Sequence, residues 1–357
     1  MATTITYQGG LSVDEVRSRV KAAKIYKLSS NENPRGPSPM VVQAIQAAAA
    51  SLNLYPPRDD GMLRQVLAAH YQRGLTPDHF VCANGGSEIL QMISRTFLQP
   101  EDEFIVASPT FGAYVRFASA QGAKAVDVPL RAGDFTYAVD ALLAAITPRT
   151  RLLFICNPNN PTGSIMTSAD LARLVGAAPD HVTLVADQVY EPYVSHPDYP
   201  DTLGHVLTNK PVVIVKTFSK SYGLAGLRLG YLIAPPELTT RLRRQVRGFH
   251  INSLALTAGV AALQDQAYVQ ESAQLSQRGK AYLYGELERL NVQCWPSEGN
   301  FVLIAPARPA QQVYEGLLER GVMVRPTDTF GYPPGLRVTV GLPEANEAFI
   351  AALTEIL

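Results

Sequence analysis

Short apolar runs rich in β-branched residues recur through the first two thirds of the 357-residue chain. Seven such runs lie at 79–85, 103–109, 124–130, 151–158, 182–190, 211–219 and 229–235. Segments with helical spacing of apolar residues separate most of them, for example 87–98, 136–146 and 168–178. Strands that alternate with helices indicate a mainly parallel, doubly wound sheet that is covered on both faces.

The pattern changes after about residue 240. Helical stretches dominate at 238–249 and 272–290, and three short strand candidates follow at 300–306, 322–326 and 336–342. We therefore predict a large α/β domain over 31–240 and a smaller α+β domain over 241–357. We expect residues 1–30 to form an N-terminal arm that packs on the small domain or on a partner subunit.

The composition fits a globular chain with a large core, because 46% of the residues are hydrophobic and 17% are charged. Lys plus Arg and Asp plus Glu both number 31, so no overall field attracts nucleic acid or anionic membrane.

The three cysteines are far apart in the sequence, and Cys82 and Cys156 lie in apolar runs. This favours free thiols over disulfides for Cys82, Cys156 and Cys294. No histidines have metal-ligand spacing, so no metal is expected. Neither a secretory signal nor a membrane span is visible, which predicts a cytoplasmic location.

Polar, Gly or Pro residues stand at five predicted strand ends: 84–88, 108–114, 157–163, 186–190 and 217–220. In open α/β sheets, ligands bind at the carboxyl ends of the strands. The Gly85–Gly86 turn opens a helix with Ser87 as a candidate N-cap, and free amides there favour a phosphate. An ordinary capped turn would explain the same residues.

Two lysines follow the apolar run 211–215, and the question is which of them does chemistry. Lys216 lies within the strand, whereas Lys220 falls beyond its end, among the other polar groups, with Arg228 eight residues later. A desolvated lysine beside an arginine has a lowered pKa and can form a Schiff base with an aldehyde. Asp187 ends a buried run and needs a cation or hydrogen-bond donors, such as the ring nitrogen of a pyridine cofactor.

The strings at 30–39, 157–163 and 217–231 resemble the signatures of pyridoxal-phosphate enzymes of fold type I, the aspartate aminotransferase superfamily. The similarity runs from Tyr7 to about residue 346. Within that superfamily the chain is most similar to the histidinol-phosphate aminotransferase family, through 28–39, 55–68, 225–231, 300–303 and 336–341. The resemblance implies a large domain with a mainly parallel seven-stranded sheet and a smaller α+β domain.

The resemblance also implies roles for individual residues. Lys220 would carry pyridoxal 5'-phosphate as a Schiff base and move protons, Asp187 would pair with the ring nitrogen, and Tyr190 would hold the phenolic oxygen together with Asn160. Phe111 would stack on the face of the cofactor ring. The phosphate would be held by the backbone amides of Ser87 and Glu88 and by the side chains of Thr217, Ser219 and Arg228. Tyr55 of a partner subunit would also reach the phosphate. Arg337 would receive the anionic group of the substrate, with Arg325, Tyr7 and Asn33 nearby.

The implied function is ping-pong transamination of histidinol phosphate with 2-oxoglutarate, in histidine biosynthesis, by a homodimer that shares its active sites. Gln188 departs from the family pattern, where an acid is usual, and so do the segments 248–255 and 84–88. An aromatic amino-acid aminotransferase is the nearest alternative, because one arginine can bind a carboxylate or a phosphate.

A pyridoxal-phosphate lyase or decarboxylase, such as one acting on threonine phosphate, is a further alternative. A cofactor-binding regulatory module is disfavoured, because no basic DNA-binding extension is present. A nicotinamide-binding protein is disfavoured too, because the first strand has no GxGxxG string after it.

Overall fold

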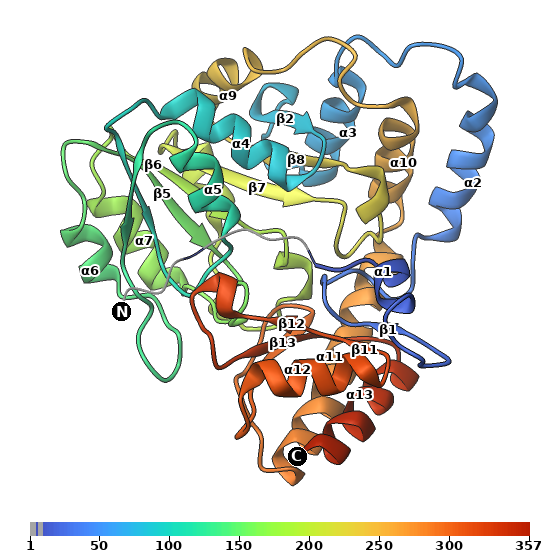
Figure 1. Ribbon diagram of the computed structural model, residues 1–357. Coiled ribbons are helices and arrows are strands. Elements are labelled where there is room, and N and C mark those ends of the chain that lie inside the picture. Colours follow the sequence, from blue (N-terminus) through green and yellow to red (C-terminus); the bar gives the residue numbers. More distant parts are fainter. Residues whose placement is uncertain (1–4, 6–9) are drawn as a thin grey trace.

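The computed structural model describes residue 5 and residues 10–357, and it divides into two layered regions (Figure 1). The larger region contains one seven-stranded sheet in the order β2-β8-β7-β6-β5-β3-β4. Six strands are parallel, and only β8 runs antiparallel to its neighbours β2 and β7. The predicted doubly wound, mainly parallel sheet of seven strands is confirmed. Its strands are β2 (Phe80–Ala83), β3 (Glu103–Val106), β4 (Lys124–Asp127), β5 (Thr150–Cys156), β6 (Thr183–Asp187), β7 (Val212–Thr217) and β8 (Gly230–Ile233).

Helices cover both faces of this sheet, because its central strands are buried along their whole length. Buried residues of α4 (Gly86–Phe97), α5 (Ala113–Ser119) and α9 (Pro236–Arg243) form the core on one face. The opposite core is built by α2 (Pro39–Ala48), α3 (Gly61–Tyr71), α6 (Val139–Ala144), α7 (Ser168–Ala177), α8 (Thr202–Leu207) and α10 (Ser253–Gln264).

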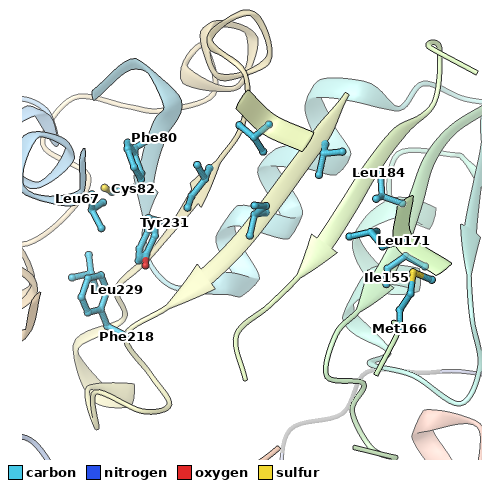
Figure 2. Close-up of a cluster of buried hydrophobic side chains, with 14 of the residues drawn as sticks. Leu67, Phe80, Cys82, Ile155, Met166, Leu171, Leu184, Phe218, Leu229 and Tyr231 are labelled. Carbon is cyan, nitrogen blue, oxygen red and sulfur yellow. The ribbon is translucent and has the colours of Figure 1, made fainter. Parts of the chain in front are cut away.

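Figure 2 shows part of the second core, where Leu171 of α7 lies against Ile155 and Leu184 of the sheet. Cys82 is fully buried in the same cluster and Cys156 is buried in the other, and both are free thiols. The expectation of buried free thiols is therefore confirmed for these two residues. Cys294 is also free and is partly buried.

The smaller region is built around a four-stranded antiparallel sheet in the order β12-β13-β10-β9. Its strands are β9 (Gln293–Cys294), β10 (Phe301–Ala305), β12 (Arg325–Pro326) and β13 (Leu336–Thr339), and α12 (Ala310–Glu319) and α13 (Pro343–Ile356) pack on it. The N-terminal segment joins this region, because β1 (Tyr26–Lys27) pairs with β11 (Val322–Met323) after the short α1 (Val13–Arg17).

One long helix, α11 (Gln266–Arg289), connects the two regions. Val269 near its start belongs to the core of the large sheet, while Leu283 and Leu287 near its end belong to the core of the small one. The helix α10, beyond residue 240, packs on α2 and α3. The expected domain boundaries at 30 and 240 stay predictions.

Five single-turn 3-10 helices complete the described part of the chain. They are η1 (Ala49–Ser51), η2 (Pro77–His79), η3 (Glu191–Tyr193), η4 (Ala225–Leu227) and η5 (Asp328–Phe330). Among the described residues, no helix combines the length and the apolar character needed to cross a bilayer.

Candidate active site

A cavity of about 250 Å³ opens at the carboxyl ends of the central strands, between the two regions. We call it the strand-end cavity. It brings together residues that are distant in the sequence, as expected for an open α/β sheet. The predicted site residues that line it are Ser87, Phe111, Asn160, Asp187, Tyr190, Thr217, Ser219, Lys220, Arg228, Arg325 and Arg337.

Three other described candidates do not line the strand-end cavity. The contact expected of Glu88 is through its backbone amide, which lies in the first turn of α4, and this contact stays a prediction. The Glu88 carboxylate accepts hydrogen bonds from the backbone and side-chain nitrogens of Asn84 at 2.5 and 2.9 Å. Asn33 is buried and lines a different, much smaller cavity, and Tyr55 is 86% exposed. Tyr7 lies outside the described residues.

Lys220 projects into the strand-end cavity just beyond the end of β7. Its Nζ donates a hydrogen bond of 2.8 Å to the carbonyl oxygen of Ser30 and lies 5.6 Å from the centre of the Tyr190 ring. Burial, followed by the nearby positive charge of Arg337, lowers the pKa of Lys220 to about 7. A large fraction of this amine is therefore unprotonated at neutral pH, and an unprotonated amine is a nucleophile and a base.

Lys216 lies in a different environment, although it is only four residues away. It is 6% exposed, and its Nζ pairs with the carboxylate of Glu191 at 2.8 Å. Both residues line a second cavity of about 460 Å³, which we call the lateral cavity. The structure therefore separates the two lysines and leaves Lys220 alone in the strand-end cavity.

Asp187 ends β6 and is 3% exposed. Burial raises its pKa to about 6, although the hydroxyl of Tyr114, which donates 2.8 Å to Oδ2, opposes this rise. The amide of Val189 donates to Oδ1 at 3.3 Å. Sequence reasoning missed Tyr114, although it stands in the string 108–114 that was singled out. Its ring stacks on Phe154 with centroids 5.0 Å apart, which fixes the hydroxyl against the carboxylate.

A polar network surrounds the hydroxyl of Tyr190. It accepts hydrogen bonds from the side-chain amides of Asn31 at 2.9 Å and Asn160 at 3.4 Å. Arg337 in turn donates 2.6 Å to the side-chain oxygen of Asn160 and 2.5 Å to the carbonyl of Ser29. Burial lowers the pKa of Arg337 to about 10, so its guanidinium stays charged at neutral pH. The network holds both the phenol and the guanidinium in fixed positions.

Asn31 is a second residue that the sequence did not single out. The candidate was Asn33, two positions later, but its side chain donates to the carbonyl of Ser221 and the hydroxyl of Ser272, both at 2.9 Å. Asn31 has φ of 55°, in the left-handed region that Asn tolerates better than most residues. This backbone conformation turns the Asn31 side chain toward Tyr190.

The first turn of α4 and the loop after β7 form a cradle for an anion. Gly85 has φ of 86° and is the N-cap of α4, so the expected cap at Ser87 is wrong. A Cβ at Gly85 would lie 2.6 Å from a guanidinium nitrogen of Arg228, so only glycine allows this approach. Arg228 Nη1 lies 3.5 Å from the Ser219 hydroxyl, and Thr217 lines the same space. Free amides, hydroxyls and a guanidinium at a helix N-terminus suit a phosphate.

Phe330 is a third residue that sequence reasoning missed. It lies at the end of η5 and is 5% exposed. The guanidinium carbons of Arg325 and Arg337 lie 5.7 and 5.4 Å from the centre of its ring. Since Arg325 and Arg337 are register partners on β12 and β13, this end of the cavity carries two adjacent positive charges beside one aromatic ring.

Gln188, which departs from the family pattern, points away from the strand-end cavity. Its side-chain nitrogen donates 2.7 Å to the hydroxyl of Thr202. The negative charge on this side comes from Glu191 instead, through its pair with Lys216. Gln188 and Glu191 both line the lateral cavity, so this cavity carries a carboxylate although position 188 is neutral.

The fold and this site define the class of protein. A family model described as aminotransferase class I and II matches residues 23–353, and the chain belongs to this family. A histidinol-phosphate aminotransferase from Moorella thermoacetica is 44% identical over 98% of this chain and 90% of that protein.

Solved structures share the fold over nearly the whole chain. The structure of histidinol-phosphate aminotransferase from Sinorhizobium meliloti in complex with pyridoxal-5'-phosphate has a TM-score of 0.88, at 23% identity, and covers 98% of this chain and 95% of that one. A single mutant of Thermus thermophilus aspartate aminotransferase has a TM-score of 0.85, at 25% identity, with 97% and 94% covered. The resemblance to fold type I aminotransferases is therefore confirmed.

Proposed function

We propose that this chain transfers an amino group from histidinol phosphate to 2-oxoglutarate, with pyridoxal 5'-phosphate as its cofactor. The observation that carries the proposal is the shared cavity of Lys220 and Asp187, which holds a nucleophilic amine opposite a buried carboxylate. The 44% identity to a histidinol-phosphate aminotransferase over nearly the whole chain supports the choice of amino donor.

The residues present fit the cofactor. Lys220 supplies the amine for its aldehyde, the start of α4 with Ser219 and Arg228 supplies donors for its phosphate, and Asp187 supplies an anion for its ring nitrogen. When bound, the cofactor supplies the carbonyl carbon that carries the amino group and a ring that accepts electrons from the substrate.

Asp187 would keep a proton on the ring nitrogen of the bound cofactor, because a carboxyl group with a pKa of about 6 is mostly ionised at neutral pH. Tyr114 holds this carboxylate in one orientation through its hydrogen bond of 2.8 Å. With the cofactor bound, the amine of Lys220 would act as general base and then general acid: it would take the proton from the substrate carbon and return it to the carbon that receives the amino group. Its pKa of about 7 suits both directions of proton transfer at neutral pH.

The far end of the cavity suits a substrate with a phosphate or a second carboxylate. Arg325 and Arg337 stand side by side there, and a dianionic phosphate can accept hydrogen bonds from two guanidinium groups. Phe330 forms an aromatic wall beside them, against which an imidazole ring can pack. These groups bind donor and acceptor in turn, as ping-pong kinetics requires.

We also propose a homodimer that completes the site, with Tyr55 of the partner reaching the phosphate. Tyr55 is 86% exposed, and its ring packs against that of Phe249, with centroids 5.4 Å apart; Phe249 is itself 50% exposed. Exposed Leu52, Leu54 and Met62 lie close to Tyr55 in the sequence. Exposed apolar side chains on neighbouring segments are typical of an interaction surface. The cytoplasmic location stays a prediction from the sequence.

A donor screen with 2-oxoglutarate tests this function. Histidinol phosphate is expected to give the highest kcat/KM, with phenylalanine and tyrosine far lower, because neither aromatic donor carries a phosphate for the paired arginines. A higher kcat/KM for the aromatic donors would reject the substrate assignment. Release of carbon dioxide from threonine phosphate without a keto acceptor would point to the decarboxylase alternative.

A further inference from the structure

A third cavity, much smaller than the other two, lies where α11 meets the segment that leads into β10. Its volume is about 10 Å³, which is about the space of one water-sized sphere. Its polar lining residues are all buried, with exposed fractions of 2–8%, and they are Asn33, Tyr193, Ser272, Ser276 and Asn300.

Two polar side-chain atoms of the lining residues lack a hydrogen-bond partner among the described residues. Ser272 donates from its hydroxyl to the carbonyl of Tyr268, and Asn33 uses both ends of its amide. The hydroxyl of Ser276 and the side-chain oxygen of Asn300 are completely buried, and neither has a hydrogen-bond partner within residues 10–357. Buried polar atoms are almost always paired, with protein or with ordered water.

We propose that a single water molecule binds in this cavity and bridges Ser276 Oγ and Asn300 Oδ1. The water donates one proton to Asn300 Oδ1 and forms a second hydrogen bond with the Ser276 hydroxyl. The phenol of Tyr193, on the cavity wall, is the third polar group. A water with about three hydrogen bonds in a space of one sphere is the usual form of a buried structural water.

The bridge acts on the active site through Asn300. The side-chain nitrogen of Asn300 donates 3.1 Å to the carbonyl of Asn31, and Asn31 donates 2.9 Å to the hydroxyl of Tyr190. An amide whose oxygen is fixed by water cannot turn over and present its oxygen to the Asn31 carbonyl. The water thereby keeps Asn31 in its left-handed conformation and holds the Tyr190 hydroxyl in place.

Ser276 and Asn300 are therefore positioning residues, and the water ties together three separate segments. Ser276 belongs to α11, Asn300 directly precedes β10, and Asn31 follows β1. The consequence for the cofactor rests on the proposed function, whereas the water site itself does not.

High-resolution crystal structures of the whole chain test the water directly. We expect one well-ordered water within hydrogen-bond distance of Ser276 Oγ and Asn300 Oδ1. No water there, with Asn300 turned over or bonded directly to another protein group, would overturn the inference. The electron density shows whether the water is bound, whether or not the chain binds pyridoxal phosphate. A chain that bound no pyridoxal phosphate would refute the proposed function but not the water site.

Two substitutions test the link to Tyr190. Ser276→Val fills the cavity and displaces the water, and Ser276→Ala removes one of its partners, so at least one folded variant is expected. Ser94→Ala is the matched control, because Ser94 is equally buried in a helix but donates only to the Leu90 carbonyl of its own helix.

The measurement is the pH midpoint of the visible absorbance of the bound cofactor, followed together with the melting temperature. Displacing the water is expected to move this midpoint by about half a pH unit, a threefold change in the acid constant. Ser94→Ala should leave the midpoint unchanged. If the Ser276 variants lower only the melting temperature and keep the wild-type midpoint, the link to Tyr190 is refuted.

Discussion

Lys216 lies within β7 and Lys220 just beyond its end, and their side chains enter two different cavities. In the lateral cavity, Lys216 has a carboxylate partner, Glu191, at 2.8 Å. In the strand-end cavity, burial and then the charge of Arg337 lower the pKa of Lys220 to about 7, although the carboxylates of Glu32 and Asp187 oppose this shift. The comparison shows that the neighbours of a buried amine decide whether it is a structural cation or a reactive group.

The largest expected effect separates the two lysines. Lys220→Ala should lower the transamination rate by at least about 10³-fold, because it removes both the cofactor attachment and the general base. Lys216→Ala is the matched control and should keep most of the activity, since it lines the other cavity. Steady-state rates with 2-oxoglutarate measure both. If the Lys216 variant lost activity and the Lys220 variant kept it, Lys216 and not Lys220 would be the reactive lysine.

The next effect concerns the buried acid. Asp187→Asn should lower kcat on the order of 10²-fold, because a neutral amide no longer stabilises a protonated ring nitrogen.

Tyr114→Phe should have a smaller effect, on the pH dependence of kcat. It removes the hydrogen bond that lowers the Asp187 pKa, so this pKa rises above about 6. Since the ionised form is the active one, the acidic limb of the kcat profile should move to higher pH. An unchanged profile would mean that Tyr114 does not control this carboxylate.

A third experiment isolates the charge environment of Lys220. Cofactor uptake by the cofactor-free chain needs the unprotonated amine, so its rate should rise about tenfold per pH unit below 7 and level off above it. Arg337→Gln removes a charge that lowers the Lys220 pKa, so the rise should move to higher pH by roughly half a unit or more. The same shift in Arg325→Gln but not in Arg337→Gln would contradict the assignment.

The smallest effect is expected on the side of Lys216. Glu191→Gln leaves a buried cation without its partner and should reduce the free energy of unfolding by about 1 kcal/mol, because Glu191 is partly exposed to water. The double variant with Lys216→Met should recover much of this loss, since it removes the unpaired charge. Denaturant unfolding measures both. Equal stability of the single variant and the wild type would show that the pair contributes nothing.

The sequence predicted the sheet and the residues at its strand ends, because apolar runs and polar ends are local signals. Asp187 and Lys220 could be found in this way, and the structure places both in one cavity. Tyr114 and Phe330 could not, since their contacts depend on how α5 and η5 pack against other elements. Asn31, and not the predicted Asn33, contacts Tyr190, and its left-handed backbone conformation is not specified by the residue pattern.

Reduction with borohydride, followed by peptide mass spectrometry, tests whether Lys220 is the lysine that binds the cofactor. After incubation of the purified chain with pyridoxal 5'-phosphate, we expect a stable pyridoxyl adduct on Lys220 and none on Lys216. An adduct on Lys216, or a colourless chain that retains no vitamer after reduction, would contradict this expectation.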